Sequence, residues 1–215
     1  DSGVGGLTVA REIMRQMPEE RIVYFGDTAR VPYGSKSQDT IIRYSRQIIR
    51  FLMTKHVKAI VIACNTASAY ALATVEKEFD VPIIGVIRAG ARTAVQVTRN
   101  GKIGVIATEG TIGSGIYTQE IKKLRPDIEV TGKPCPLFVP LVEEGLLHDS
   151  VTDEIASRYL SSLKSRFVDT LVLGCTHYPL IRSTLGRLMG NDVTLVNPAY
   201  ETAIELRDLL QKYGL

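Results

Sequence analysis

Short apolar runs alternate with longer amphipathic stretches along most of this 215-residue chain. The runs are rich in Val and Ile and are bounded by polar or Gly-containing segments, which is typical of buried parallel strands. Between them, apolar residues recur every three or four positions, as on the buried face of a helix. The predicted strands are residues 21–25, 59–63, 82–86, 103–107, 128–132, 170–174 and 193–197. The predicted helices are residues 7–17, 40–54, 67–79, 116–124, 152–167 and about 200–212. This alternation predicts an α/β fold with parallel strands.

The pattern restarts halfway along the chain. The opening turn DSGVGG (1–6) precedes a helix, and the Gly/Thr-rich turn TEGTIGSG (108–115) precedes another. We therefore predict two pseudo-symmetric, doubly wound parallel-sheet domains, with the active site in the cleft between them. The predicted domains are residues 1–88 and 89–198, with a C-terminal helix at 199–215 that packs back on the first domain. Because a Gly-rich turn before a helix normally follows a strand, a short apolar strand is also expected ahead of Asp1.

Two of the predicted strands end in a cysteine. Cys64 follows the first apolar run in AIVIACNTAS (59–68), and Cys175 follows the run in TLVLGCTHYP (170–179). The carboxyl ends of strands in α/β sheets are where ligands bind. For either cysteine alone, core packing is an equally good explanation, because a free cysteine behaves as a small hydrophobe. The recurrence at matching positions, each with polar neighbours, favours a catalytic pair.

Composition removes several other classes of function. The chain is 45% apolar and 23% charged, as in ordinary globular proteins, and no apolar run approaches the ~20 residues that span a bilayer. Its net charge of +3 comes from interleaved rather than clustered charges, so nucleic-acid binding is not indicated. The three cysteines, Cys64, Cys135 and Cys175, have no zinc-site or C-x-x-C spacing and form no even disulfide set. Reduced thiols, no metal and a cytoplasmic location are therefore expected.

Two thiols on opposite walls of a cleft suit one reaction in particular. A thiolate on one face of a carbon acid removes a proton while the opposite thiol supplies another, which inverts the stereocentre. The ordinary thiol pKa of about 8.5 lets either cysteine act as acid or base. His177 is placed to assist Cys175, and Asp1 to assist Cys64, although capping or packing roles remain open for both. His56 and His148 are expected at the surface.

Short polar side chains beside the cysteines suit an amino-acid substrate. Asn65, Thr66 and Thr176 offer hydrogen-bond donors near helix N-termini, where anions are favoured, although each also suits helix capping. In the polar loop after residue 25, Tyr33 either closes over a small ligand or lies in a turn with an exposed ring. Asp27 in that loop is expected to bond its own turn in the second case.

The motifs DSGVGG, GDTARVPYG, ACNTAS, CPLFVPLVEEG and GCTHYPLI, in this order, closely resemble those of bacterial glutamate racemases in the aspartate/glutamate racemase superfamily. The resemblance covers nearly the whole chain. It implies two pseudo-symmetric α/β domains, no pyridoxal or other cofactor, and conversion of L-glutamate to D-glutamate for peptidoglycan. It departs from the family at Arg88 and Ala89, where an acidic residue and a proline are usual, and at residues 197–203, where a D-S-G-A-type turn is usual.

The same resemblance gives roles to individual residues. Cys64 and Cys175 are implied as the two bases, with Asp1 and His177 as assisting groups. The positions that match substrate-binding residues are Ser2, Pro32, Tyr33, Gly34, Asn65, Thr66, Thr176, Thr108 and Thr111. Asp27 and Glu143 match further acidic positions near the family's active site.

Three other functions stay open on the sequence alone. The first is an aspartate racemase or another racemase of the superfamily, in which a different side-chain carboxylate fits. The second is a cysteine hydrolase that uses Cys175 and His177 without Cys64. The third is a non-catalytic amino-acid-binding module. A homodimer is compatible with all of these functions, and the small-molecule partner expected is glutamate.

Overall fold

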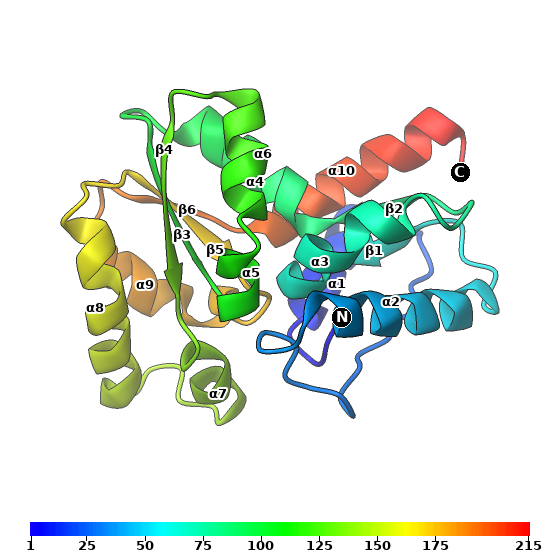
Figure 1. Cartoon of the computed structure of the whole chain (residues 1–215), viewed down its shortest axis with the longest axis horizontal. Coiled ribbons are helices and arrows are strands. Elements are labelled where there is room, and N and C mark those ends of the chain that lie inside the picture. Colours follow the sequence, from blue (N-terminus) through cyan, green and yellow to red (C-terminus); the bar gives the residue numbers. More distant parts are fainter.

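The computed structural model describes residues 1–215 and has the expected α/β architecture, with two separate sheets whose strands all run parallel (Figure 1). The first half carries a two-stranded sheet and its helices. Its elements are α1 (Leu7–Gln16), α2 (Gln38–Met53), β1 (Ile60–Ile62), α3 (Asn65–Val75) and β2 (Ile83–Gly85). Each corresponds to a predicted element within a few residues.

The second half contains a four-stranded parallel sheet in the order β4-β3-β5-β6. Its elements are α4 (Val86–Val97), β3 (Lys102–Ala107), α5 (Glu109–Gly113), α6 (Ile116–Leu124), β4 (Glu129–Pro134), α7 (Phe138–Glu143), α8 (Ser150–Lys164), β5 (Thr170–Gly174), the 3-10 helix η1 (Tyr178–Ile181), α9 (Arg182–Met189) and β6 (Thr194–Val196). The chain ends in α10 (Pro198–Tyr213).

The four-stranded sheet is buried on both faces, which explains why its strands read as continuous apolar runs. Val105 and Val172 point into a core shared with α4 and α6, whereas Leu171 and Leu173 point into a core with α8 and α9. This alternation follows from the two-residue period of a strand. In Figure 1, α8 and α9 lie on the outer side of the sheet and α4 and α6 lie on the side of the first half.

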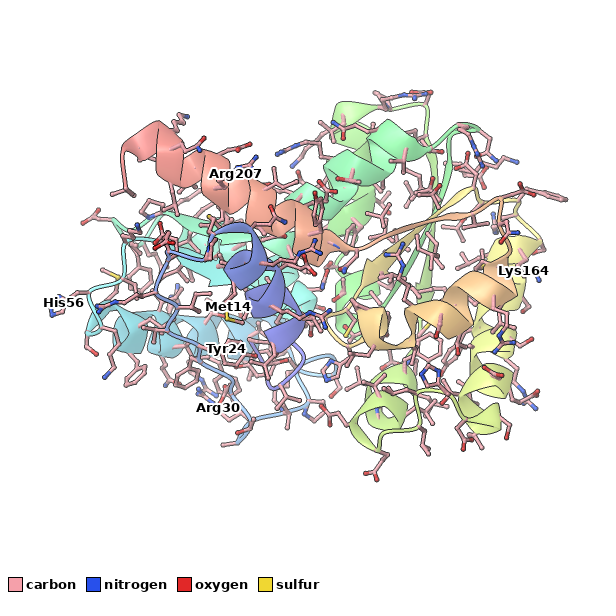
Figure 2. The ribbon with its side chains drawn as sticks, turned by 180° about the vertical axis from the view of Figure 1, so that it is seen from behind. Met14, Tyr24, Arg30, His56, Lys164 and Arg207 are labelled. Carbon is pink, nitrogen blue, oxygen red and sulfur yellow. The ribbon has the colours of Figure 1, made fainter.

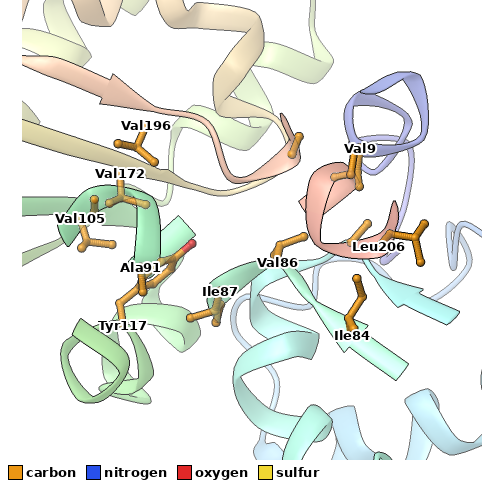
Figure 3. Close-up of a cluster of buried hydrophobic side chains, with 14 of the residues drawn as sticks. Val9, Ile84, Val86, Ile87, Ala91, Val105, Tyr117, Val172, Val196 and Leu206 are labelled. Atoms are coloured by element: carbon orange, nitrogen blue, oxygen red, sulfur yellow. The ribbon is translucent and has the colours of Figure 1, made fainter. Parts of the chain in front are cut away.

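One hydrophobic core joins the two halves. It contains Val9 of α1, Ile84 of β2 and Leu206 of α10 together with Val105 and Val172 of the larger sheet (Figure 3). Helix α10 packs against α1 and α4. Figure 2 shows α1 beside α10, with the exposed Met14 on α1. The predicted domain boundary at residue 88 falls inside α4, and the division into domains stays a prediction.

The predicted strand at residues 21–25 is wrong: this segment is extended but forms no sheet. No backbone hydrogen bond joins residues 21–24 to another strand, and Ile22, Val23 and Tyr24 are exposed. The segment is separated from the open edge of β1 by an apolar groove of about 460 Å³. A strand needs a neighbour within about 5 Å, and across this groove neither edge has one.

Six of the ten α-helices match predicted ones, whereas α4, α5, α7 and α9 and the 3-10 helix η1 were not predicted. The Gly/Thr-rich segment 108–115 was predicted to be a turn but contains α5, whose N-cap Thr108 accepts a hydrogen bond from the Thr111 N–H through its side chain. Helix α4 was not predicted, because Gly90 and the boundary placed at residue 88 concealed its helical period. No helix combines the length and apolarity that a membrane crossing requires.

Candidate active site at two cysteines

Cys64 lies where β1 turns into α3. Its sulfur is the N-cap of α3 and accepts a hydrogen bond from the Ala67 N–H at 3.5 Å. Ser68 holds the turn, because its hydroxyl donates to the Ile62 carbonyl and accepts from the Val86 N–H. The Cys64 side chain is buried at the positive end of a helix, where negative charge on an atom is stabilised.

Cys175 occupies the matching position at the end of β5. It is buried, and burial raises the pKa of its thiol to about 12. Tyr117 connects the two cysteine segments, because its hydroxyl donates to Asn65, next to Cys64, and its ring lies against Gly174, next to Cys175. That the two sulfurs face a common cleft stays a prediction.

A histidine and a carboxylate extend from Cys175. The Cys175 sulfur lies 3.8 Å from His177 Nδ1, and His177 Nε2 lies 2.9 Å from Glu143 Oε1. His177 is buried, whereas the Glu143 side chain is 45% exposed. A proton can therefore pass between the thiol and the imidazole, and Glu143 orients the ring. His56 and His148 are exposed, as predicted.

The opening turn of the chain contacts both cysteine segments. Asp1 Oδ2 accepts hydrogen bonds from the N–H groups of Gly3 and Gly6, each at 2.9 Å, while Oδ1 is buried without a partner. Asp1 lines the same groove as Ala63 and Ala67, which flank Cys64 in the sequence. On the other side, a Cβ atom on Gly5 would lie 2.3 Å from Thr176 Oγ1, so only glycine lets the turn approach Cys175 so closely.

Tyr33 is buried, and the alternative of a turn with an exposed ring is therefore wrong. Its hydroxyl donates to the Asp27 carboxylate, which also accepts from Arg30 Nε. Burial, followed by this hydrogen bond, raises the pKa of Tyr33. The loop continues to Gly34, whose carbonyl accepts a hydrogen bond from the Gly110 N–H at 2.9 Å and so joins the two halves.

Three threonine hydroxyls meet between the halves. Thr66 Oγ1 lies 2.9 Å from Thr108 Oγ1 and 3.2 Å from Thr111 Oγ1, and the last two are 3.1 Å apart. Thr176 contributes from the Cys175 side, where its carbonyl accepts a hydrogen bond from Thr8. Two predicted site residues are less enclosed, because Ser2 is half-buried and Pro32 is exposed.

Tyr117 is a residue of this region that the sequence did not reveal. It is buried on α6, and its hydroxyl donates to Asn65 Oδ1 at 2.7 Å. Its place on the apolar side of an amphipathic helix gave only the signal of a core residue. A pairing with Asn65, 52 positions away, has no local signature.

The known proteins that this chain resembles in sequence are racemases. The model of the family described as Asp/Glu/Hydantoin racemase matches residues 7–204. A glutamate racemase from Geobacter metallireducens is 52% identical over 98% of this chain and 78% of its own length. One from Oceanobacillus iheyensis is 48% identical over 100% of this chain and 79% of its own length.

Solved structures agree in shape. A glutamate racemase isoform from Bacillus anthracis superposes with a TM-score of 0.97 at 45% identity, over 100% of this chain and 80% of that one. The glutamate racemase of Francisella tularensis, solved in complex with D-glutamate, gives a TM-score of 0.93 at 41% identity over the same shares. An aspartate racemase from Picrophilus torridus, at 18% identity and a TM-score of 0.65, shares the fold.

Proposed function

The chain belongs to the Asp/Glu/Hydantoin racemase family, and we propose that it is a glutamate racemase that inverts the α-carbon by proton transfer between Cys64 and Cys175. The observation that supports this proposal is the pair of buried thiols at matching strand ends of the two halves, with Tyr117 in contact with the residues beside both. The activity is that of an isomerase, and the glutamate racemases above are similar to this chain over nearly all its length. The alternative of an aspartate racemase has weaker support, because its similarity lies in the fold.

The proton transfers need no further reactant. In one direction the Cys64 thiolate takes the α-proton of glutamate, so a C–H bond breaks and an S–H bond forms. The electron pair left on the α-carbon delocalises into the adjoining carboxylate. Cys175 then gives its proton to the opposite face, and the raised pKa of its thiol keeps that proton in place until the carbanion forms. In the other direction His177 assists Cys175 as the base.

Donors around the two thiols suit the carboxylates of glutamate. The N–H groups at the start of α3 and the threonine hydroxyls meet where a negatively charged substrate would lie. The residues proposed to contact or enclose glutamate are Ser2, Pro32, Tyr33, Gly34, Asn65, Thr66, Thr108, Thr111 and Thr176. Asp1 and His177 assist Cys64 and Cys175 respectively, whereas Asp27 holds Tyr33 and Glu143 holds His177.

The test is incubation of the purified protein with L-glutamate in D₂O, following optical rotation and α-deuterium together. Racemisation predicts loss of rotation with deuterium at the α-carbon. Cys64→Ser and Cys175→Ser should each slow inversion by at least about 100-fold, since each removes one acid–base group. Cys135→Ser is the matched control, because Cys135 is also buried but its sulfur donates to the Lys133 carbonyl and has no histidine partner, and it should keep the rate. Unchanged inversion in either of the first two variants would contradict the two-thiol mechanism.

The Cys175–His177–Glu143 arrangement also fits a cysteine hydrolase, in which a base oriented by a third group activates a nucleophile. This alternative predicts that Cys64→Ser keeps its activity and that an acyl-enzyme accumulates on Cys175. Mass spectrometry of the protein after exposure to activated esters or amides distinguishes the two functions.

We also propose, from the resemblance to the family, that the D-glutamate formed supplies peptidoglycan synthesis in the cytoplasm. Expression of this chain in a bacterium that depends on added D-glutamate tests this role. Growth without D-glutamate supports it, and growth that still needs the supplement contradicts it.

A further inference from the structure

Tyr117 links the second half of the molecule to the first beside the catalytic cysteines. The residue lies on α6 and is only 3% exposed, and its hydroxyl donates to Asn65 Oδ1 at 2.7 Å. Asn65 directly follows Cys64, and the Tyr117 ring lies against Gly174, which directly precedes Cys175. The phenol therefore lies close to both thiol segments without being one of the acid–base groups.

The Tyr117 ring has little freedom to move. A Cβ atom on Gly174, the residue before Cys175, would lie 3.2 Å from Tyr117 Cε2, and one on Gly90 of α4 would lie 3.5 Å from the hydroxyl. Figure 3 shows the ring beside Ala91 and Ile87 in the core between the halves. Burial raises the pKa of Tyr117, so its hydroxyl stays protonated and remains a donor at neutral pH.

The carboxamide of Asn65 has two distinct ends. Its oxygen is occupied by the Tyr117 hydroxyl, and its nitrogen makes no hydrogen bond within the protein. This nitrogen has no hydrogen-bond partner but is not completely buried, so it faces space that solvent reaches. An amide presents either oxygen or nitrogen to such a space, and only the NH₂ group attracts a carboxylate.

We infer that Tyr117 is a positioning residue that fixes the Asn65 carboxamide so that its NH₂ group faces a carboxylate of glutamate. The inference rests on the proposed function for the identity of the anion. Without the phenol hydroxyl, the amide can turn its oxygen toward the substrate, and two like partial charges then oppose each other. A donor fixed in advance also saves the cost of ordering it when the substrate binds.

Tyr117→Phe removes the hydroxyl and keeps the ring. We expect the KM for L-glutamate to rise about tenfold while kcat changes less than about threefold, because the interaction acts on bound substrate in both ground and transition states. In an Asn65→Ala background, Tyr117→Phe should change KM less than about twofold, since its effect is transmitted through that amide. Tyr159→Phe is the control, because its hydroxyl is bonded to Leu137 N–H on the outer side of the larger sheet.

An unchanged KM in Tyr117→Phe, or an equal increase with and without Asn65, would overturn the inference. If Tyr117→Phe does not fold, Asn65→Asp is tested in its place. The new carboxylate still accepts the hydrogen bond from the Tyr117 hydroxyl but has an oxygen in place of the NH₂ group. It should weaken glutamate binding more than about tenfold with an unchanged thermal midpoint, and unchanged binding would overturn the inference.

Calorimetric titration with L-glutamate separates this inference from the proposed function. If the unaltered chain binds glutamate without racemising it, the proposed function fails, and weaker binding by Tyr117→Phe still supports the positioning role. If the unaltered chain racemises glutamate and Tyr117→Phe binds it equally well, the proposed function stands and the inference fails. Absence of glutamate binding by the unaltered chain would overturn both.

Discussion

The surroundings of a cysteine decide whether its thiol is a packing group or an acid. Burial raises the pKa of both Cys135 and Cys175 to about 12, so the raised value alone does not mark a catalytic residue. Both lie in the same apolar core, but the Cys135 sulfur donates to the Lys133 carbonyl, whereas the Cys175 sulfur lies 3.8 Å from His177 Nδ1. The difference in function comes from the partners that can exchange a proton with the sulfur.

Loss of stability in alkali is expected from the Cys175 thiol. Its folded pKa of about 12 exceeds the ordinary value of about 8.5, so between these pH values the unfolded chain releases a proton that the folded chain keeps. The free energy of unfolding then falls as pH rises, by about 1.4 kcal/mol per pH unit for each such thiol. Cys175→Ser lacks this group, so its decrease between about pH 9.5 and about pH 10.5 should be smaller by about 1 kcal/mol in urea unfolding. Equal decreases would mean that the folded protein ionises Cys175 as easily as the unfolded chain does.

A single helix or strand of this fold is predicted correctly where interactions within its own sequence are sufficient to form it. Helix α6 has the predicted bounds, because its apolar period and its flanking Gly115 at a left-handed φ of 69° act locally. Residues 21–25 have the apolar composition of a strand, but a strand forms only when hydrogen bonds connect it to a neighbouring strand. Asp1 already makes hydrogen bonds of this kind with the end of the segment. Its amino group donates to the Phe25 carbonyl, and its carbonyl accepts from the Asp27 N–H.

An extended apolar segment fused ahead of Asp1 should therefore enter the groove between residues 21–25 and β1. Parallel pairing on both sides would satisfy the open backbone groups and cover Val9, Ile13 and other apolar side chains that line the groove. We expect about 2 kcal/mol of added stability and a rise of about 4–8 °C in thermal midpoint for a chain of this size. A Gly/Ser segment of equal length is the control and should leave the midpoint unchanged. The same result for both segments would contradict strand insertion.

The two halves are connected through segments that lie against each other. A Cβ atom on Gly90 of α4 would lie 2.9 Å from Cγ of Pro198, the first residue of α10. The threonine cluster and the Gly110-to-Gly34 hydrogen bond join the halves on the side of the cysteines. Because both thiols are almost fully buried, we expect the proposed substrate to reach them when these contacts between the halves open.

Gly90→Ala tests how tightly the connecting segments pack. The added methyl group must displace Pro198, and we expect a loss of about 1–3 kcal/mol in the free energy of unfolding by urea. Gly113→Ala is the control in α5, where a Cβ atom would meet nothing within 4 Å, and it should be neutral or stabilising by up to about 1 kcal/mol. Equal stability of Gly90→Ala and the unaltered chain would show that the segments have room to move apart.

The sequence by itself determined the α/β class, all six strands, the six longer amphipathic helices that match predicted ones, and the placement of Cys64 and Cys175 at strand ends. Strand and helix periods and turn residues act over a few positions, whereas the short helices α5, α7 and α9 and the Gly-containing α4 gave no clear period. Only the tertiary structure decided that residues 21–25 stay unpaired, that Tyr33 is buried on Asp27, and that Glu143 and Tyr117 contact His177 and Asn65. Each of these depends on which distant segment lies beside a residue, and a local pattern carries no information about that neighbour.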